Sequence, residues 1–122
     1  MSMKKVLVVD DNVDAAKTLS MLLKALKHEP HTAHDGEEAL TLAGDVEPDL
    51  ILLDLNLPKV NGADVCRQIR CRPGGERPAI FALSGMGLDE ARDKMDNAGF
   101  SGHLVKPISL PDLQSLLATL PE

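Results

Sequence analysis

Three apolar segments without a polar face limit the folds that this chain can adopt. They are "VLVV" at residues 6–9, "LILL" at 50–53 and "AIFAL" at 79–83. A strand with one face in water alternates apolar and polar residues, and these segments do not alternate. Uninterrupted apolar strands are typical of a parallel sheet that is covered by helices on both faces. The sequence therefore predicts an α/β fold.

Helical patterns separate the apolar segments. From Val13, small and apolar residues recur at steps of three and four, which predicts an amphipathic helix capped by Asn12. Further helices are expected over 35–43, 62–69 and 88–98, and a last one begins at a capping box of Ser109 and Asp112. Short strands near 31–34 and 102–106 complete the pattern, with the first at an edge of the sheet because Pro30 precedes it. Five strand–helix repeats predict a doubly wound, three-layer (βα)5 sandwich.

Composition restricts the function classes. The 122 residues are expected to form a single domain over 1–122, and a net charge of −6 without a basic stripe argues against direct nucleic-acid binding. No apolar run is long enough to cross a membrane, so we expect no membrane insertion and a cytoplasmic location. Cys66 and Cys71 are five positions apart without clustered histidines, which disfavours a zinc site or a disulfide and makes Cys66 a core residue.

Polar residues follow the predicted strands at the point where each one ends. Asp10 and Asp11 follow the first apolar segment, Asp54 ends the second, Ser84 ends the third, and the last short strand ends at Lys106 and Pro107. The carboxyl ends of parallel strands lie along one edge of a sheet, where sites of doubly wound folds form. These side chains are therefore expected to converge in one shallow pocket.

The chemistry of this set points to phosphoryl transfer. A cluster of carboxylates is unfavourable unless a cation offsets it, and Mg²⁺ prefers hard oxygen ligands of this kind, with Mn²⁺ as a second candidate. A metal ion, an ammonium and a hydroxyl together suit the oxygens of a phosphoryl group. Asp54 is then the natural nucleophile, forming an acyl phosphate, while Asp10 and Asp11 hold the metal.

At these positions the chain resembles the receiver domain of two-component response regulators. The resemblance runs from "VLVVDDN" to the final leucine-rich helix and includes "DLILLDLNLPKVNG", "ALSG" and "KP" in the family's order and spacing. Each motif alone is weak evidence for the family, and the motifs together are specific for it. The resemblance implies a flavodoxin-like fold whose five-stranded parallel sheet has the order 2-1-3-4-5.

The resemblance also implies roles by position. Asp54 matches the phosphoacceptor, and Asp10 and Asp11 match the acidic pair, with Asp11 as the direct metal ligand. The remaining matches are the backbone carbonyl of Asn56 as a metal ligand, Ser84 as the hydroxyl on the phosphoryl oxygen, Lys106 as the lysine paired with that oxygen, and a cis bond between Lys106 and Pro107.

One position near the site departs from the family's pattern, and two others are variable in the family. His103 stands where a tyrosine or phenylalanine usually turns inward on activation, so it is either a switch residue or a surface histidine without that role. Asn56 and Met86 occupy positions that tune loss of the phosphoryl group. The surface that would carry the signal comprises the 88–98 helix, the His103 strand and the last helix.

The implied function is that of a phosphoacceptor signalling domain, not an enzyme in the ordinary sense, although such domains can catalyse their own phosphorylation and dephosphorylation. Its partners would be a histidine kinase or histidine phosphotransfer protein and an unidentified output protein or domain. An aspartyl-nucleophile phosphatase of haloacid-dehalogenase type is the alternative, but it usually carries a DxD pair rather than adjacent Asp10 and Asp11. The chain could stand alone or belong to a hybrid sensor histidine kinase.

Overall fold

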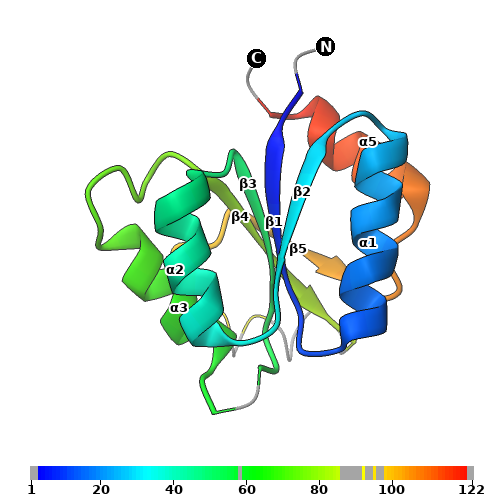
Figure 1. Ribbon diagram of the computed structural model, residues 1–122. Helices are drawn as coiled ribbons and strands as arrows, with labels where there is room; N and C mark the ends of the chain where they lie inside the picture. The colour runs from blue at the N-terminus through cyan, green and yellow to red at the C-terminus, as the bar shows by residue number, and fades with distance from the viewer. Residues whose placement is uncertain (1–2, 58, 86–91, 93–94, 96–97, 121–122) are drawn as a thin grey trace.

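The computed structural model describes residues 3–57, 59–85, 92, 95 and 98–120. Five parallel strands form one sheet in the order β2-β1-β3-β4-β5, with α1 and α5 on one side of it and α2 and α3 on the other (Figure 1). The elements are β1 (Lys5–Val9), α1 (Val13–Ala25), β2 (Glu29–Ala33), α2 (Gly36–Val46), β3 (Leu50–Asp54), α3 (Gly62–Arg70), β4 (Ala79–Ser84), β5 (Gly102–Val105) and α5 (Leu110–Ala118). The predicted fold and strand order are confirmed.

Alternate residues of the central strands enter two separate cores. In β1, Val6 and Val8 pack with buried residues of α1 and α5, whereas Leu7 and Val9 pack with buried residues of α2 and α3. The five residues of β3 are all buried. A strand with helices on both faces has no side on which a polar residue is solvated, which explains the uninterrupted apolar runs.

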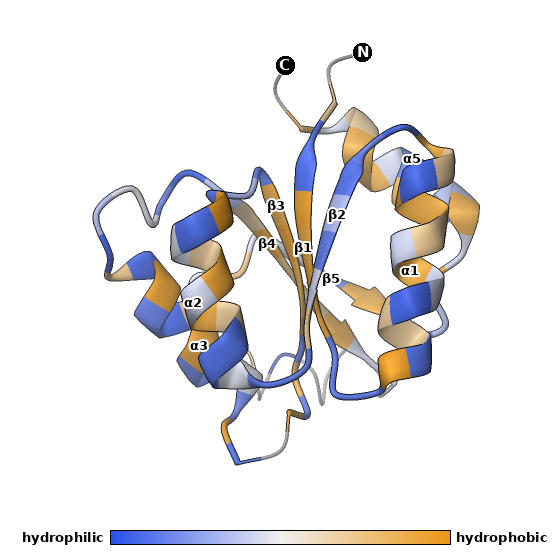
Figure 2. Cartoon of the chain, viewed as in Figure 1, coloured by the Kyte–Doolittle hydropathy of each residue, from blue (hydrophilic) through white to orange (hydrophobic). Residues whose placement is uncertain are grey.

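The strand β2 differs from the others because it forms an edge of the sheet. Four of its five residues are only partly buried. In Figure 2 much of β2 has the blue colour of hydrophilic residues. Pro30 lies inside β2 and not just before it, in register with Val6. Proline lacks a backbone donor, and an edge strand tolerates that loss.

Capping side chains start the helices where the sequence indicates. The Asn12 side chain accepts a hydrogen bond from the Ala15 backbone N–H, 3.1 Å away, and begins α1. Ser109 and Asp112 form a reciprocal capping box at the start of α5. Each cap satisfies backbone N–H groups that have no partner within the helix.

The expected helix over 88–98 falls mostly on residues outside those described, and so does Met86. Of that segment, Arg92 and Met95 are helical, and Met95 packs against Leu55 and Ala82. Met95 therefore faces the core.

Two further expectations from composition can be compared with the structure. Cys66 lies on the buried face of α3, where burial raises the pKa of its thiol to about 11, and Cys71 is exposed. Both cysteines are free thiols. Among the described residues, no helix combines the length and hydropathy that crossing a bilayer requires.

Candidate functional site

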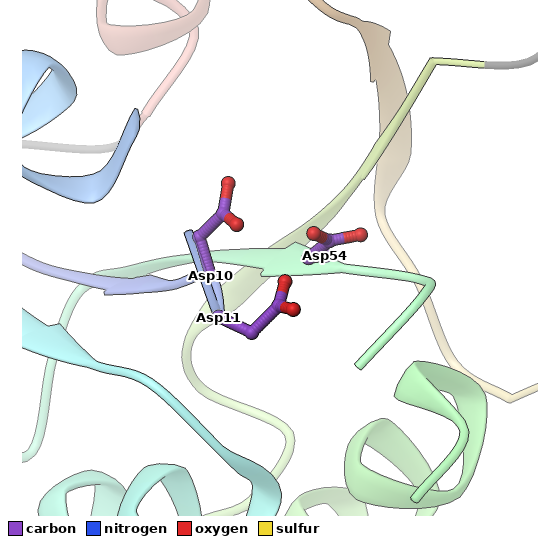
Figure 3. A group of neighbouring side chains, drawn as sticks. All are labelled: Asp10, Asp11 and Asp54. Atoms are coloured by element: carbon purple, nitrogen blue, oxygen red, sulfur yellow. The ribbon is translucent and has the colours of Figure 1, made fainter. Parts of the chain in front are cut away.

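Three carboxylates meet at the carboxyl ends of β1 and β3. Asp10 and Asp11 follow β1 and Asp54 ends β3, and each offers an oxygen within 4.8 Å of the others. Figure 3 shows the three side chains facing a common space. Asp10 and Asp54 are buried, at 0% and 4% exposure, whereas Asp11 is exposed. The site is thus open to solvent on the side of Asp11.

Lys106 joins the two buried carboxylates. Its Nζ lies 2.8 Å from Asp10 Oδ2 and 2.9 Å from Asp54 Oδ2. Burial of the ammonium acts to lower the pKa of Lys106, but the hydrogen bonds to Asp10 and Asp54 outweigh it and raise the pKa above its ordinary value. The lysine therefore stays charged and offsets part of the negative charge of the cluster.

The second oxygen of each buried carboxylate bonds to its own loop. Asp10 Oδ1 accepts the backbone N–H of Asn12 at 3.0 Å, and Asp54 Oδ1 accepts that of Asn56 at 2.8 Å. Aspartates commonly hold a turn in this way, two residues ahead in the chain. Both carboxylates are thereby fixed in orientation, each by a loop contact and a contact to Lys106.

Ser84 lies on β4, next to β3, and His103 lies on β5, next to β4. Ser84 ends β4, is buried, and its backbone carbonyl accepts the N–H of Lys106 at 2.8 Å. His103 lies on β5 opposite Ala82 and is partly buried. Within the described part of the chain, its Nε2 is buried without a hydrogen-bond partner. The Lys106–Pro107 bond is cis, as expected.

Gly62 allows α3 to begin directly against the end of β3. A Cβ atom at this position would lie 2.4 Å from the carbonyl oxygen of Asp54 and 2.8 Å from Leu55 Cα. Those are backbone atoms, which cannot move aside as the end of a long side chain can. Only glycine fits this contact, which fixes the end of β3 against the start of α3.

His34 also lies near the site, although it is not among the residues predicted from the strand ends. It follows β2, and its Nδ1 lies 3.1 Å from the backbone oxygen of Asp10. His34 occupies a position like those of the predicted site residues, because β2 is parallel to β1 and the two strands end side by side. The strand predicted near 31–34 does end at His34, but the local sequence gives no signal that its ring contacts the backbone oxygen of Asp10.

The donor set fits a divalent cation that prefers oxygen. Asp11 is exposed beside two buried carboxylates, so a cation entering from solvent would meet oxygen ligands from three residues. Mg²⁺ typically takes few carboxylates and retains several waters. The exposure of Asp11 leaves room for such waters.

The fold and site define a class of protein: a doubly wound flavodoxin-like domain that gathers carboxylates, a hydroxyl and an ammonium at the carboxyl ends of its strands. The chain belongs to the response regulator receiver domain family, whose model matches residues 6–118. It is therefore a receiver domain of two-component systems, a signalling domain and not a classical enzyme. The match favours this class over the haloacid-dehalogenase-type alternative.

Solved structures agree with this assignment. The chemotaxis protein CheY4 of Vibrio cholerae superposes with a TM-score of 0.90 at 30% identity, covering 98% of this chain and 100% of that one. The receiver domain of the sensor histidine kinase PA1611 from Pseudomonas aeruginosa superposes with a TM-score of 0.89 at 29% identity, covering 98% of both chains. That structure is described with a magnesium ion coordinated in its active site cleft.

The curated relatives are longer proteins. A probable transcriptional regulator of Cyanophora paradoxa is 34% identical over 96% of this chain and 48% of its own length. The sensor histidine kinase AtsR of Burkholderia thailandensis is 35% identical over 93% of this chain and 19% of its own length. The chain thus spans less than half the length of either relative.

Proposed function

We propose that Asp54 is the phosphoacceptor of this receiver domain and that residues 1–122 form one such domain. One observation carries the proposal. The Asp54 carboxylate is buried, held between the Lys106 ammonium at 2.9 Å and the Asn56 N–H at 2.8 Å, and lies beside two further carboxylates. A nucleophile fixed in this way loses little conformational freedom when it reacts.

In the proposed reaction an oxygen of Asp54 attacks the phosphorus of the donor. A phosphorus–oxygen bond forms, and the phosphorus–nitrogen bond of a phosphohistidine breaks, with its electron pair left on the imidazole of the donor. Lys106 offsets the negative charge that builds on the phosphoryl oxygens, and the Ser84 hydroxyl donates to one of them. Ser84 ends β4, which is adjacent to the Asp54 strand, and Lys106 follows β5, one strand further along the sheet.

Asp10, Asp11, Asp54 and the backbone carbonyl of Asn56 are the proposed ligands for Mg²⁺. The bound ion would neutralise the carboxylates and the incoming phosphoryl oxygens. The oxygen donors and the exposed side of the site support this assignment. Mn²⁺ prefers similar oxygen ligands and is a reasonable substitute in binding experiments.

The proposed donor is a histidine kinase or a histidine phosphotransfer protein, and the recipient of the signal is an output protein or domain. Relatives that include a transcriptional regulator and a sensor histidine kinase support this pairing. Small donors such as acetyl phosphate would also serve, because the chain supplies the nucleophile and the charged groups itself. The chemistry and the proposed partners suit the cytoplasm.

Ser84 and His103 are the proposed switch. A phosphoryl group brings up to about two negative charges, and movement of the Ser84 hydroxyl toward it would leave space near β5. His103 lies on β5, one strand from Ser84, with a buried Nε2 that lacks a partner among the described residues. Inward rotation of His103 would then alter the β4–β5–α5 surface and the 88–98 segment. Asn56 and Met86 are proposed to tune phosphoryl loss, and Met86 lies outside the described residues.

The switch can be tested by histidine NMR on the free and phosphorylated protein. We expect the ring resonances of His103 to move on phosphorylation, while those of His31, which pairs with Glu29 on the far edge of the sheet, stay in place. A His103 ring environment that is unchanged by phosphorylation at two pH values would exclude the switch role.

The phosphoacceptor can be tested by mass spectrometry after treatment with acetyl phosphate and Mg²⁺. The wild type is expected to gain the mass of one phosphoryl group, and D54N is expected to gain none while keeping its circular dichroism spectrum. D45N alters an exposed aspartate of α2 and should label as the wild type does. Labelling of D54N at the wild-type level would refute the assignment.

A further inference from the structure

The backbone of Asp10 is held on both sides by two consecutive residues at the end of β2. Its N–H donates to the Ala33 carbonyl at 3.0 Å. Its carbonyl oxygen lies 3.1 Å from His34 Nδ1, and because a carbonyl only accepts, the ring nitrogen is the donor. Asp10 is fully buried, so neither backbone group has water as an alternative partner.

This contact replaces a bond that the sheet does not supply. Strand pairing between β1 and β2 ends at Val9 and Ala33, one residue before Asp10. A continued parallel ladder would offer the Asp10 carbonyl a backbone N–H. The chain instead turns toward α2, whose first residue follows the cap Asp35, and the imidazole of His34 provides the N–H.

His34 is itself anchored. Its backbone N–H donates to the Glu38 side chain at 3.0 Å, and the Glu38 N–H donates to Asp35 Oδ1 at 2.8 Å. The start of α2 thus fixes the backbone from which the ring reaches Asp10. A connected set of contacts runs from the first turn of α2 to the peptide between Asp10 and Asp11.

We propose that His34 is a positioning residue for the acidic site and fixes the Asp10–Asp11 peptide so that the Asp11 carboxylate is preorganised for a divalent cation. The inference rests on the metal ligands assigned under the proposed function. The carboxylate of Asp10 is already oriented by Lys106 and the Asn12 N–H. Loss of the His34 contact is therefore expected to disturb mainly the position of the Asp11 carboxylate. Asp11 is exposed and directly follows the carbonyl that His34 holds.

The first test is the affinity for Mg²⁺ alone, measured by isothermal titration calorimetry. H34A is expected to weaken Mg²⁺ binding about tenfold, the lower end for loss of a group that supports a ligand from outside the coordination shell. H31A removes a histidine of β2 that pairs with Glu29, and this variant should bind Mg²⁺ as the wild type does. An H34A affinity equal to that of wild type would overturn the proposal.

Two amide substitutions separate positioning from packing. Asparagine places an N–H near the position of Nδ1, whereas glutamine places it near that of Nε2. H34N is expected to restore Mg²⁺ affinity to within about twofold of wild type, and H34Q is not. The comparison of H34N with H34Q also tests the positioning role if H34A does not fold. Equal affinities for H34N and H34Q would overturn the proposal.

A metal-free measurement keeps the inference distinct from the proposed function. The carbonyl ¹³C resonance of Asp10 reports the hydrogen bond to its oxygen, and it should move upfield in H34A and return in H34N. If wild-type protein bound no Mg²⁺, the ligand assignment would fail while this resonance still tested the contact. An unchanged resonance in H34A would refute positioning by His34 whatever the metal does.

Discussion

Lys106 Nζ lies 2.9 Å from Asp54 Oδ2, although the two residues are 52 positions apart in the chain. The same ammonium reaches Asp10 Oδ2 at 2.8 Å, so one cation serves two buried carboxylates. This arrangement fixes the Asp54 carboxylate before any ion or phosphoryl group arrives. It also makes the stability of the empty site depend on Lys106.

Replacing Lys106 by methionine should destabilise the metal-free protein by about 3 kcal/mol. This value is the lower end for breaking a buried ion pair, because the lysine side chain keeps partial access to water. Urea denaturation measures the change, and Mg²⁺ should recover more stability in K106M than in wild type. K17M, at an exposed lysine of α1, is the control. Equal stability of K106M and wild type would show that the pairing contributes nothing.

Replacing Asp11 by alanine should separate metal binding from folding. The expected loss of Mg²⁺ affinity is more than about tenfold, because a ligand matters more than a supporting group. Phosphorylation by acetyl phosphate should slow in parallel. The metal-free protein should gain up to about 1 kcal/mol in free energy of unfolding, since one of three mutually repelling charges is removed. D45A is the matched control, and unchanged Mg²⁺ affinity in D11A would contradict the ligand assignment.

Two glycine substitutions should have opposite effects. G62A would push a Cβ to 2.4 Å from the Asp54 carbonyl oxygen and is expected to cost about 1–3 kcal/mol, the range for overpacking. G44A lies within α2, where the nearest atom is the end of the Arg72 side chain at 3.6 Å, and should stabilise by about 0.4–1 kcal/mol. Thermal unfolding of both variants checks the contrast, and a G62A protein as stable as G44A would exclude the close contact.

Stability should fall as the pH drops below about 6.5, the ordinary pKa of histidine. Burial, with a smaller contribution from Lys4, lowers the pKa of His28 in the folded protein. The unfolded chain therefore binds more protons in the window between the two pKa values, and stability is lost with decreasing pH. Protonation would also break the hydrogen bond that His28 Nδ1 accepts from the Lys4 N–H at 3.0 Å.

Denaturation of wild type and H28N between pH 5 and 7.5 measures this dependence. Asparagine offers an acceptor oxygen near Nδ1 and does not titrate, so the slope near pH 6 should become shallower in H28N. H31N, at a partly exposed histidine, serves as the comparison. Identical slopes in wild type and H28N would rule out His28 as the titrating group.

Much of the site could be predicted because it lies at the ends of strands that the sequence marks clearly. The apolar runs before Asp10 and Asp54 indicate where β1 and β3 end. Parallel strands then bring those ends to one edge, whatever the details of packing. At β2 the strand predicted near 31–34 ends within one residue of the observed strand, but a histidine at the end of a partly buried edge strand is usually a surface residue. His34 was missed for that reason.

The sequence by itself determined the class of fold, the strand order through the family resemblance, the caps at Asn12 and Ser109, and the set of polar groups at the strand ends. These depend on local patterns and on the chain order of the elements. Only the tertiary structure decided which atoms pair: Lys106 with both Asp10 and Asp54, and His34 with the Asp10 carbonyl. Such contacts join residues far apart in the chain, and their geometry follows from how the strands pack and not from the local pattern around either partner.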